Sequence, residues 1–355
     1  RISVANGRFP PGIPRRTDVT AVAAKASWEL DIWGREAAKS QAAEADVRAA
    51  KFTAAQADLA LSAEVARLWF AVRGAREQLA YLETEFATRL REMELVEQTV
   101  AAGLIDSDPL SSARLAAAQA KVDEGLGRRR VAAAENALRA LIGAAPGESL
   151  PVAQGVAAMP GFGAGVPSEI LLRRPDLAAA AARLDAAVSR EGAARADFYP
   201  SVTLTGQAGW QADPASRIGQ GAAGFWSLTP AIDLPIFDAG RREANLEAAR
   251  ARIDGSGAEW TKSVLGAFRE VEDALADLRE LALQEELTAR VLAAVRSRLA
   301  NAEARRKAGL ANENELTLAR RDEALAARTL SMVVWERRQV AVRLAAATGG
   351  GWSAQ

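Results

Sequence analysis

The sequence predicts a mostly α-helical fold with a transmembrane β part, organised as a duplicated unit of two strands, one long helix and a second helix. Three observations indicate this class. Two long segments repeat at one fixed spacing, Ala-rich and charge-rich stretches have the composition of very long helices, and several short segments alternate polar with apolar side chains.

The duplication can be read directly from the residues. AAGLIDSDPLSSARLAAAQA (101–120) resembles KAGLANENELTLARRDEALA (307–326), and Gly103 corresponds to Gly309 at a spacing of 206 residues. One register held along much of the chain predicts an internal repeat rather than chance similarity among Ala-rich helices. Further positions keep the same spacing: Gly34 with Gly240, Glu64 with Glu270, and Leu138 with Leu344.

Each repeat contains two predicted helices joined by a tight turn. Gly103 and Gly309 supply the left-handed residue that commonly ends a helix. Two capping signals follow them: Asp108 as the N-cap with Pro109 at the first helical position, and Asn312 with Glu315 as a capping pair. The four predicted helices are Arg35–Ala102, Pro109–Ile142, Gly240–Ala308 and Glu313–Ala347.

The predicted helices are rich in alanine and poor in large residues, as in AAKSQAAEADVRAAKFTAAQADLALSAEVARL. Small apolar positions let neighbouring helices approach closely, whereas a globular core needs more bulk. On the helices alone, an ordinary long coiled coil is an equal alternative.

The predicted strands alternate with a period of two. In FYPSVTLTGQAGW (198–210), Val202, Leu204 and Trp210 share one face, and polar side chains such as Thr203 share the other. FWSLTPAIDLPI (225–236) and VAAKASWELDI (22–32) have the same rhythm. Each segment is about ten residues, which is enough for a tilted strand to cross a bilayer.

A soluble sheet with one wet face would give the same alternation. Three features favour the membrane: Trp28, Trp210 and Trp226 lie near strand ends, the connecting segments are polar, and the helices leave no compact core for a sheet to cover.

RISVANGRF (1–9) is expected to be the end of a fourth strand. Four strands cannot close on themselves, because the smallest barrels have about eight and open edges in lipid leave backbone groups unpaired. We therefore expect three copies to share a twelve-stranded barrel, which the helices continue as a tube. Glu29, Asp31 and Asp233 would face its lumen, and Asp31 corresponds to Asp233 because DLPIFDAG is four residues longer than DIWG.

Composition excludes several kinds of protein. The chain has 355 residues with 45 basic and 45 acidic side chains, so it lacks the positive excess of a nucleic-acid-binding protein. It has no His and no Cys, which removes thiolate nucleophiles, Ser-His arrangements and Cys/His zinc sites. We expect no enzyme activity, no metal and no cofactor. No apolar run is long enough for a transmembrane helix, and the opening Arg1 suggests that a preceding segment is missing.

These patterns divide the chain into seven expected segments. They are the strands and loop of the first repeat (1–34), its helical hairpin (35–150), a linker (151–174), a helix opening the second repeat (175–197), the second strand pair (198–237), the second helical hairpin (238–348) and a C-terminal tail (349–355).

Five motifs then carry a family resemblance over essentially the whole chain: WELDIWGR (28–35), LLRRPDLAAAAARLDAA (171–187), ARADFYPSVTLTGQAG (194–209), IDLPIFDAGRR (232–242) and KAGLANENEL (307–316). In this order they resemble the outer membrane efflux protein (TolC-like) family, in its NodT-type lipoprotein branch.

The resemblance implies a homotrimer in the outer membrane of a Gram-negative bacterium, extending into the periplasm. It would be a passive exit duct for small molecules, fed by an inner-membrane RND-type pump through a periplasmic adaptor (membrane fusion) protein. Multidrug resistance and a palmitate-bearing lipidated cysteine are usual in this branch, but the chain has no Cys. Type I secretion and metal efflux are alternative uses of such a duct.

The resemblance also implies a gate at the periplasmic tip, near the second hairpin turn. Asn312, Glu313 and Glu315 lie there, and three copies of Glu315 would form a carboxylate ring that attracts cations. The alternative is that Glu315 only caps a helix. Leu318 departs from the family pattern, which often has a second Asp there. Asp106 and Asp108 mark the first turn and are expected to face the adaptor or solvent.

Other charged groups have expected structural roles. Pro175 and Asp176, after Arg174, predict a helix N-terminus rather than a ligand contact. For the basic clusters 128–130, 305–307 and 320–321 we favour solvated faces over salt bridges between helices. A periplasmic adaptor is a further alternative, but it predicts one hairpin instead of two; a soluble structural coiled coil leaves the alternating segments unexplained.

Overall fold

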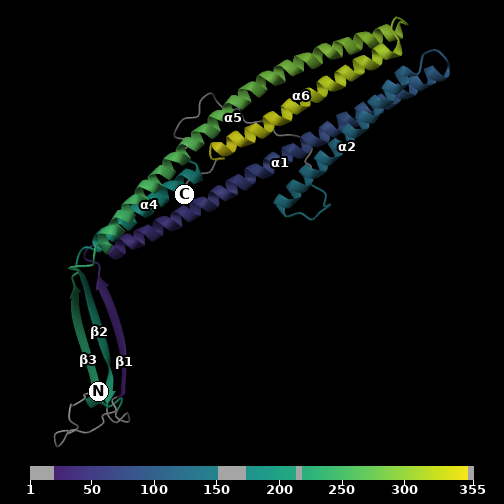
Figure 1. Cartoon of the computed structure of the whole chain (residues 1–355). Coiled ribbons are helices and arrows are strands. Elements are labelled where there is room, and N and C mark those ends of the chain that lie inside the picture. The colour runs from purple at the N-terminus through teal and green to yellow at the C-terminus, as the bar shows by residue number, and fades with distance from the viewer. Residues whose placement is uncertain (1–19, 151–172, 213–217, 351–355) are drawn as a thin grey trace, which may run out of the picture. The chain divides into compact units, whose positions relative to one another are not determined.

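The computed structural model describes residues 20–150, 173–212 and 218–350. The predicted fourth strand at residues 1–9 and most of the linker at 151–174 lie outside these residues. The elements, in chain order, are β1 (Thr20–Leu30), α1 (Arg35–Ala101), α2 (Asp108–Ile142), α4 (Pro175–Ala196), β2 (Ser201–Ala212), the short 3-10 helix η2 (Gly221–Ala223), β3 (Gly224–Asp233), α5 (Arg241–Lys307) and α6 (Glu313–Ala347) (Figure 1).

The duplication is confirmed in the lengths of the helices and in the backbone. α1 and α5 each have 67 residues, and α2 and α6 each have 35. Three pairs of glycines, all with positive φ, recur at the spacing of 206 residues: Gly34 with Gly240, Gly103 with Gly309, and Gly143 with Gly349. The left-handed conformation is accessible to glycine without steric cost, so these pairs fix the helix ends at matching places.

The chain divides into two compact units. The strand unit comprises Arg1–Arg48 and Ala182–Ala258, and the helix unit comprises Ala49–Ala181 and Glu259–Gln355. Each is described separately below.

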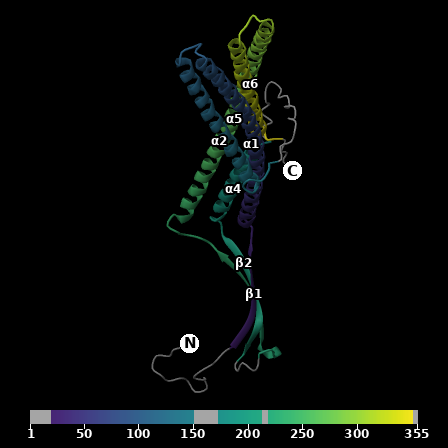
Figure 2. The same ribbon diagram turned by 90° about the vertical axis from the view of Figure 1, so that its right-hand side faces the viewer.

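The strand unit contains an antiparallel sheet in the order β1-β2-β3 (Figure 1). Figure 2 shows β1 and β2 of this sheet after a turn of 90°. Leu30 pairs with Val202, which pairs with Ile232, and Trp28 pairs with Leu204. Paired residues in an antiparallel sheet point to the same side, so the apolar sets predicted for the three strands share one face. That face is open in the chain: Trp226 is 78% exposed, and Ile232 is 72% exposed.

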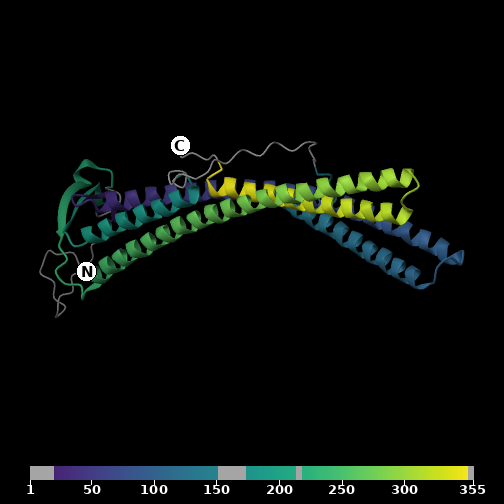
Figure 3. The same cartoon turned by 90° about the horizontal axis from the view of Figure 1, so that it is seen from above.

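The helix unit contains α2, α6, the larger parts of α1 and α5, and the start of α4 (Figure 3). Ion pairs join α1 to α2 through Arg76 and Glu135, at 2.6 Å, and α5 to α6 through Arg337 and Glu285, at 2.8 Å. The indole of Trp335 on α6 donates to Glu77 on α1 at 2.6 Å. These contacts give the order α2-α1-α6-α5, with α2 and α5 at the two edges.

The buried positions of the helices are mostly alanines, as the sequence predicts, together with a few leucines and valines. One cluster joins α4, α5 and α6 through Leu177, Val271 and Leu344. Small buried side chains allow close helix approach and leave many larger apolar side chains on the outside. Among the described residues, none of the helices combines the length and the apolar character needed to span a membrane.

Candidate functional site

The polar face of the sheet is a set of cross-strand ladders. Lys25 pairs with Gln207, and Ser27 pairs with Thr205, whose hydroxyl groups lie 3.0 Å apart. Glu29 pairs with Thr203 on the same face. Lysine, glutamine, hydroxyl and carboxylate groups on this face, opposite tryptophan, leucine and isoleucine on the other, make a surface suited to water on one side and hydrocarbon on the other.

An ion pair joins the end of β1 to the start of α1. Arg35 binds Glu29 at 2.6 Å and Asp197 at 3.3 Å. Trp33, between the strand and the helix, stacks on Tyr199 with ring centroids 4.8 Å apart and donates its indole N–H to the carbonyl of Pro200 at 2.8 Å. The predicted lumen residue Glu29 is therefore held by an arginine of its own chain.

Asp31 caps α1. Its carboxylate accepts the backbone N–H groups of Ala37 at 2.7 Å and Glu36 at 3.0 Å. The bond from Ala37, followed by that from Glu36, keeps the pKa of Asp31 below its ordinary value. Asp31 lies just after the strand, and its charge is directed at the helix N-terminus.

The second repeat assigns this capping role to a different residue. Asp238 accepts the backbone N–H of Arg242 at 3.1 Å and binds its guanidinium at 2.9 Å. Asp233, which the sequence alignment matches to Asp31, is the last residue of β3 and pairs with Ser201. The residue that caps α5 is therefore Asp238 and not the aligned Asp233, and the prediction that Asp31 and Asp233 face a lumen remains a prediction.

The second hairpin turn gathers the predicted gate residues. Asn312 is the N-cap of α6, and its side chain accepts the backbone N–H of Glu315 at 2.9 Å, as predicted. The carboxylate of Glu315 does not complete a capping box but binds Arg305 at 2.6 Å, and Glu313 binds Arg306 at 3.1 Å. The preference for solvated faces over salt bridges between helices is therefore wrong for Arg305 and Arg306. It is also wrong for Arg128, which binds Glu83 at 3.6 Å, and for Arg320, which binds Glu303 at 3.8 Å. Glu315, the carboxylate predicted to form the ring, therefore has a positive partner in its own chain, as does Glu313.

The first hairpin turn has a different chemistry. Ser107, rather than the predicted Asp108, is the N-cap of α2, because its carbonyl already accepts helical bonds from Leu110 at 3.1 Å and Ser111 at 3.2 Å. The Ser107 side chain makes no capping bond. Leu104 at this turn is 73% exposed, and both Asp106 and Asp108 lie exposed beside it.

Pro175 and Asp176 begin α4 as predicted, and the structure adds a buried arginine. The guanidinium of Arg174, 6% exposed, binds Asp176 at 2.8 Å, Glu270 of α5 at 2.8 Å and the carbonyl of Ala347 at the end of α6 at 3.0 Å. Sequence reasoning missed the contacts of Arg174 with Glu270 and Ala347 because these residues are far from it along the chain.

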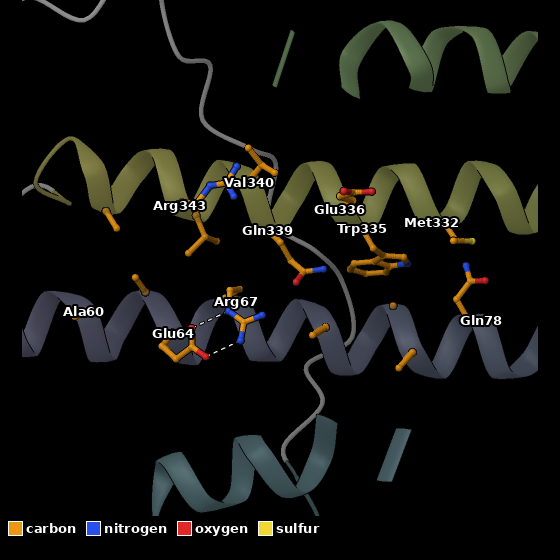
Figure 4. A pocket seen from close by; sticks show the side chains of 16 residues that line it. Ala60, Glu64, Arg67, Gln78, Met332, Trp335, Glu336, Gln339, Val340 and Arg343 are labelled. Atoms are coloured by element: carbon orange, nitrogen blue, oxygen red, sulfur yellow. Dashed lines mark hydrogen bonds and ion pairs between the residues drawn. The ribbon is translucent and has the colours of Figure 1, made fainter. Parts of the chain in front are cut away.

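A cavity of about 740 Å³ lies between α1 and α6 (Figure 4). Trp335 and Met332 line it from α6, and the ion pair of Glu64 with Arg67 lines it from α1. Gly74 makes room for the indole, because an added Cβ there would lie 3.1 Å from the Trp335 side chain. Among the described residues, no His, Cys, Asp or Glu cluster has the arrangement of a metal site. The cavity is therefore lined by apolar side chains, an indole and an ion pair.

Comparison with known proteins agrees with this arrangement. The sequence profile described as outer membrane efflux protein matches residues 14–144 and 166–350. The outer membrane protein OprJ of Pseudomonas aeruginosa is 33% identical over 334 residues, which cover 92% of this chain and 68% of OprJ. The toluene efflux pump outer membrane protein TtgF of Pseudomonas putida is 36% identical over 269 residues, covering 75% of this chain but only 55% of TtgF.

Solved structures show the same fold. The open state of the MtrE outer membrane channel of Neisseria gonorrhoeae superposes with a TM-score of 0.81 at 28% sequence identity. The superposition covers 95% of this chain and 81% of the MtrE chain.

Proposed function

This chain belongs to the outer membrane efflux protein family, and on that premise we propose that it is the outer-membrane exit duct of a tripartite efflux system. It conducts small molecules passively after an inner-membrane transporter of the RND class delivers them through a periplasmic adaptor. The duct itself performs no chemistry.

The two-faced sheet is the observation that carries the proposal. β1, β2 and β3 have 11, 12 and 10 residues, which is about the length of tilted membrane strands. Their apolar face is exposed in the single chain, and the described sheet has open edges at β1 and β3. Lipid does not tolerate open edges, so the barrel is completed by further copies, in a homotrimer.

The edges of the helix layer support the same assembly. α2 and α5, at opposite edges, carry exposed apolar side chains: Leu115, Val122 and Leu126 on α2, and Leu265, Leu283, Leu287 and Val291 on α5. When the α2 edge of one copy packs on the α5 edge of the next, the contact is head-to-tail and closes into a ring. Three copies then line one tube with twelve helices.

The two hairpin turns have separate roles at the periplasmic tip. The first turn connects α1 to α2 and exposes Leu104, Asp106 and Asp108. These residues form the surface that binds the adaptor. The second turn carries the gate, where Glu315 and Glu313 are neutralised within the chain by Arg305 and Arg306. The local field at the gate is therefore weaker than three bare carboxylates would make it.

Planar-bilayer conductance of the full-length trimer tests the proposal. Glu315→Lys places a lysine beside Arg305 and should alter the single-channel current. The double variant Arg305→Glu, Glu315→Arg exchanges the two charges and keeps the ion pair. A current restored by the exchange would assign the effect to the pair, and a current still altered would assign it to charge at position 315. A protein that stays monomeric and soluble without detergent would refute the exit duct.

A further inference from the structure

One arginine of α6 lacks a carboxylate partner. The side chain of Arg321 is half-buried, and no ion pair joins it to another of the described residues. Its neighbour Arg320, by contrast, binds Glu303 of α5 at 3.8 Å. A guanidinium that is partly withdrawn from water without a counter-charge is unfavourable, so Arg321 is suited to receive an anion.

Arg321 stands at the boundary of two cavities in the groove between α1 and α6. Their volumes are about 480 Å³ and about 700 Å³. Arg89 of α1 lines both cavities, as Arg321 does, so two arginines face this boundary from the two helices. All the residues that line the two cavities belong to the helix unit.

The other charged side chains that the structure describes along these cavities all have partners. The pairs are Glu92 with Arg89 at 3.0 Å, Glu85 with Arg328 at 3.7 Å, Glu313 with Arg306 at 3.1 Å, Glu323 with Arg296 at 2.9 Å, and Arg320 with Glu303 at 3.8 Å. One unmatched positive charge therefore remains on the described lining of the groove, and Arg321 carries it.

Apolar side chains line the cavities on both sides of the two arginines. Leu299 and Leu325 line the first cavity, and Leu95, Val96 and Leu318 line the second. Leu325 is 59% exposed and Leu95 is 40% exposed, so an apolar group in the groove would remove their surface from water. Four threonines also line the cavities, and each donates its hydroxyl group to a carbonyl of its own helix: Thr84, Thr88, Thr99 and Thr317.

We propose that this groove binds a small carboxylic acid with an apolar body. The carboxylate accepts two parallel N–H groups from Arg321, beside Arg89, and the apolar body lies along the leucines of one cavity. One unmatched guanidinium fits one negative charge, whereas a dianionic phosphate would bring a second charge without a partner and a cation would be repelled. The site belongs to the single chain, so binding does not depend on conduction through the proposed duct.

Equilibrium dialysis of the full-length trimer with radiolabelled decanoate tests the site. We expect saturable binding of one decanoate per chain, weakened at least about tenfold by Arg321→Gln, because a charge-assisted bidentate contact is lost. The matched control is Arg67→Gln, which changes an arginine already paired with Glu64 in a different cavity between α1 and α6 and should leave binding unchanged. Full binding by Arg321→Gln, or a loss confined to Arg67→Gln, would overturn the proposal.

Two further ligands separate the head group from the apolar body. Decyltrimethylammonium has the same chain length with the opposite charge, and acetate has the same charge without the chain. Both should bind at least about tenfold more weakly than decanoate. Equal binding of the cation would show unspecific adsorption to the leucines, and equal binding of acetate would show that the apolar walls contribute nothing; either result contradicts the proposed ligand.

Thermal unfolding distinguishes a ligand from a carboxylate of a second copy. Without ligand, Arg321→Gln should unfold at the same temperature as the unchanged protein or higher, because no ion pair of its own chain is lost. Decanoate should raise the unfolding temperature of the unchanged trimer and not that of the variant. A variant trimer that dissociates or unfolds at a lower temperature would show that Arg321 pairs with another copy, which would overturn the ligand site and leave the exit duct standing.

Discussion

The two hairpin turns of the helix unit share one backbone and differ in their side chains. Gly103 and Gly309 have φ values of 70° and 72°, yet of the two turns only the second has a side-chain cap, at Asn312. An ion pair spans each turn: Arg114 binds Glu97 at 2.8 Å across the first, and Arg305 binds Glu315 at 2.6 Å across the second. Both turns leave a leucine exposed, Leu104 at 73% and its counterpart Leu310 at 69%. Duplication has thus conserved the geometry that glycine enforces, whereas the side-chain cap is present at only one of the two turns.

The largest expected loss of stability comes from a variant at the base of the second hairpin. Arg174→Ala should lower the free energy of unfolding by about 3 kcal/mol, because it leaves Glu270 and the end of α6 without a buried partner. Urea unfolding of the purified trimer measures this. Arg139→Ala, which removes a bond to Glu135 within the first hairpin, should cost about 1 kcal/mol. Equal losses of unfolding free energy in the two variants would show that the contacts of Arg174 stabilise the second hairpin no more than the Arg139 contact stabilises the first.

The next prediction tests the shared backbone. Gly103→Ala and Gly309→Ala should each cost about 1–2 kcal/mol, because L-residues disfavour the left-handed conformation. An added Cβ at either glycine meets no atom within 4 Å, so backbone strain is the whole effect. Thermal unfolding of the two variants should give matching shifts. A loss at one turn only would contradict their equivalence.

Sequence reasoning succeeded where local chemistry decides the structure. Helix ends fell within one residue because glycine and Asn312 mark them, and the sheet faces followed from the period of two. It did not reach features that an insertion or a distant contact decides: no cap was predicted for α5, where Asp238 serves, and the partners of Arg305 and Arg174 depend on helix packing. The roles of Glu29, Asp233, Glu313 and Glu315 in a lumen or gate remain predictions, because they depend on the assembled copies.

Removing the N-cap side chain should have different effects at the two turns. Asn312→Ala should cost about 1 kcal/mol, since it removes the bond from the Glu315 N–H. Ser107→Ala should change little, because its side chain makes no capping bond. Hydrogen exchange at the first turn of α6 should rise in the first variant, and exchange at the first turn of α2 should stay unchanged in the second. A similar rise in both would contradict the contrast.

The smallest expected effect lies at the start of α5. Ala239 has a φ of 58°, next to left-handed Gly240, whereas the first junction uses a single left-handed glycine, Gly34. Ala239→Gly relieves this strain but adds freedom to the unfolded chain, so the net gain should be about 0.5 kcal/mol. The control is Ala244→Gly in the exposed first turns of α5, where the same chemical change should cost about 1 kcal/mol. Opposite signs in thermal unfolding would show that the insertion stores strain at this junction, and a loss in both variants would show that Ala239 bears none.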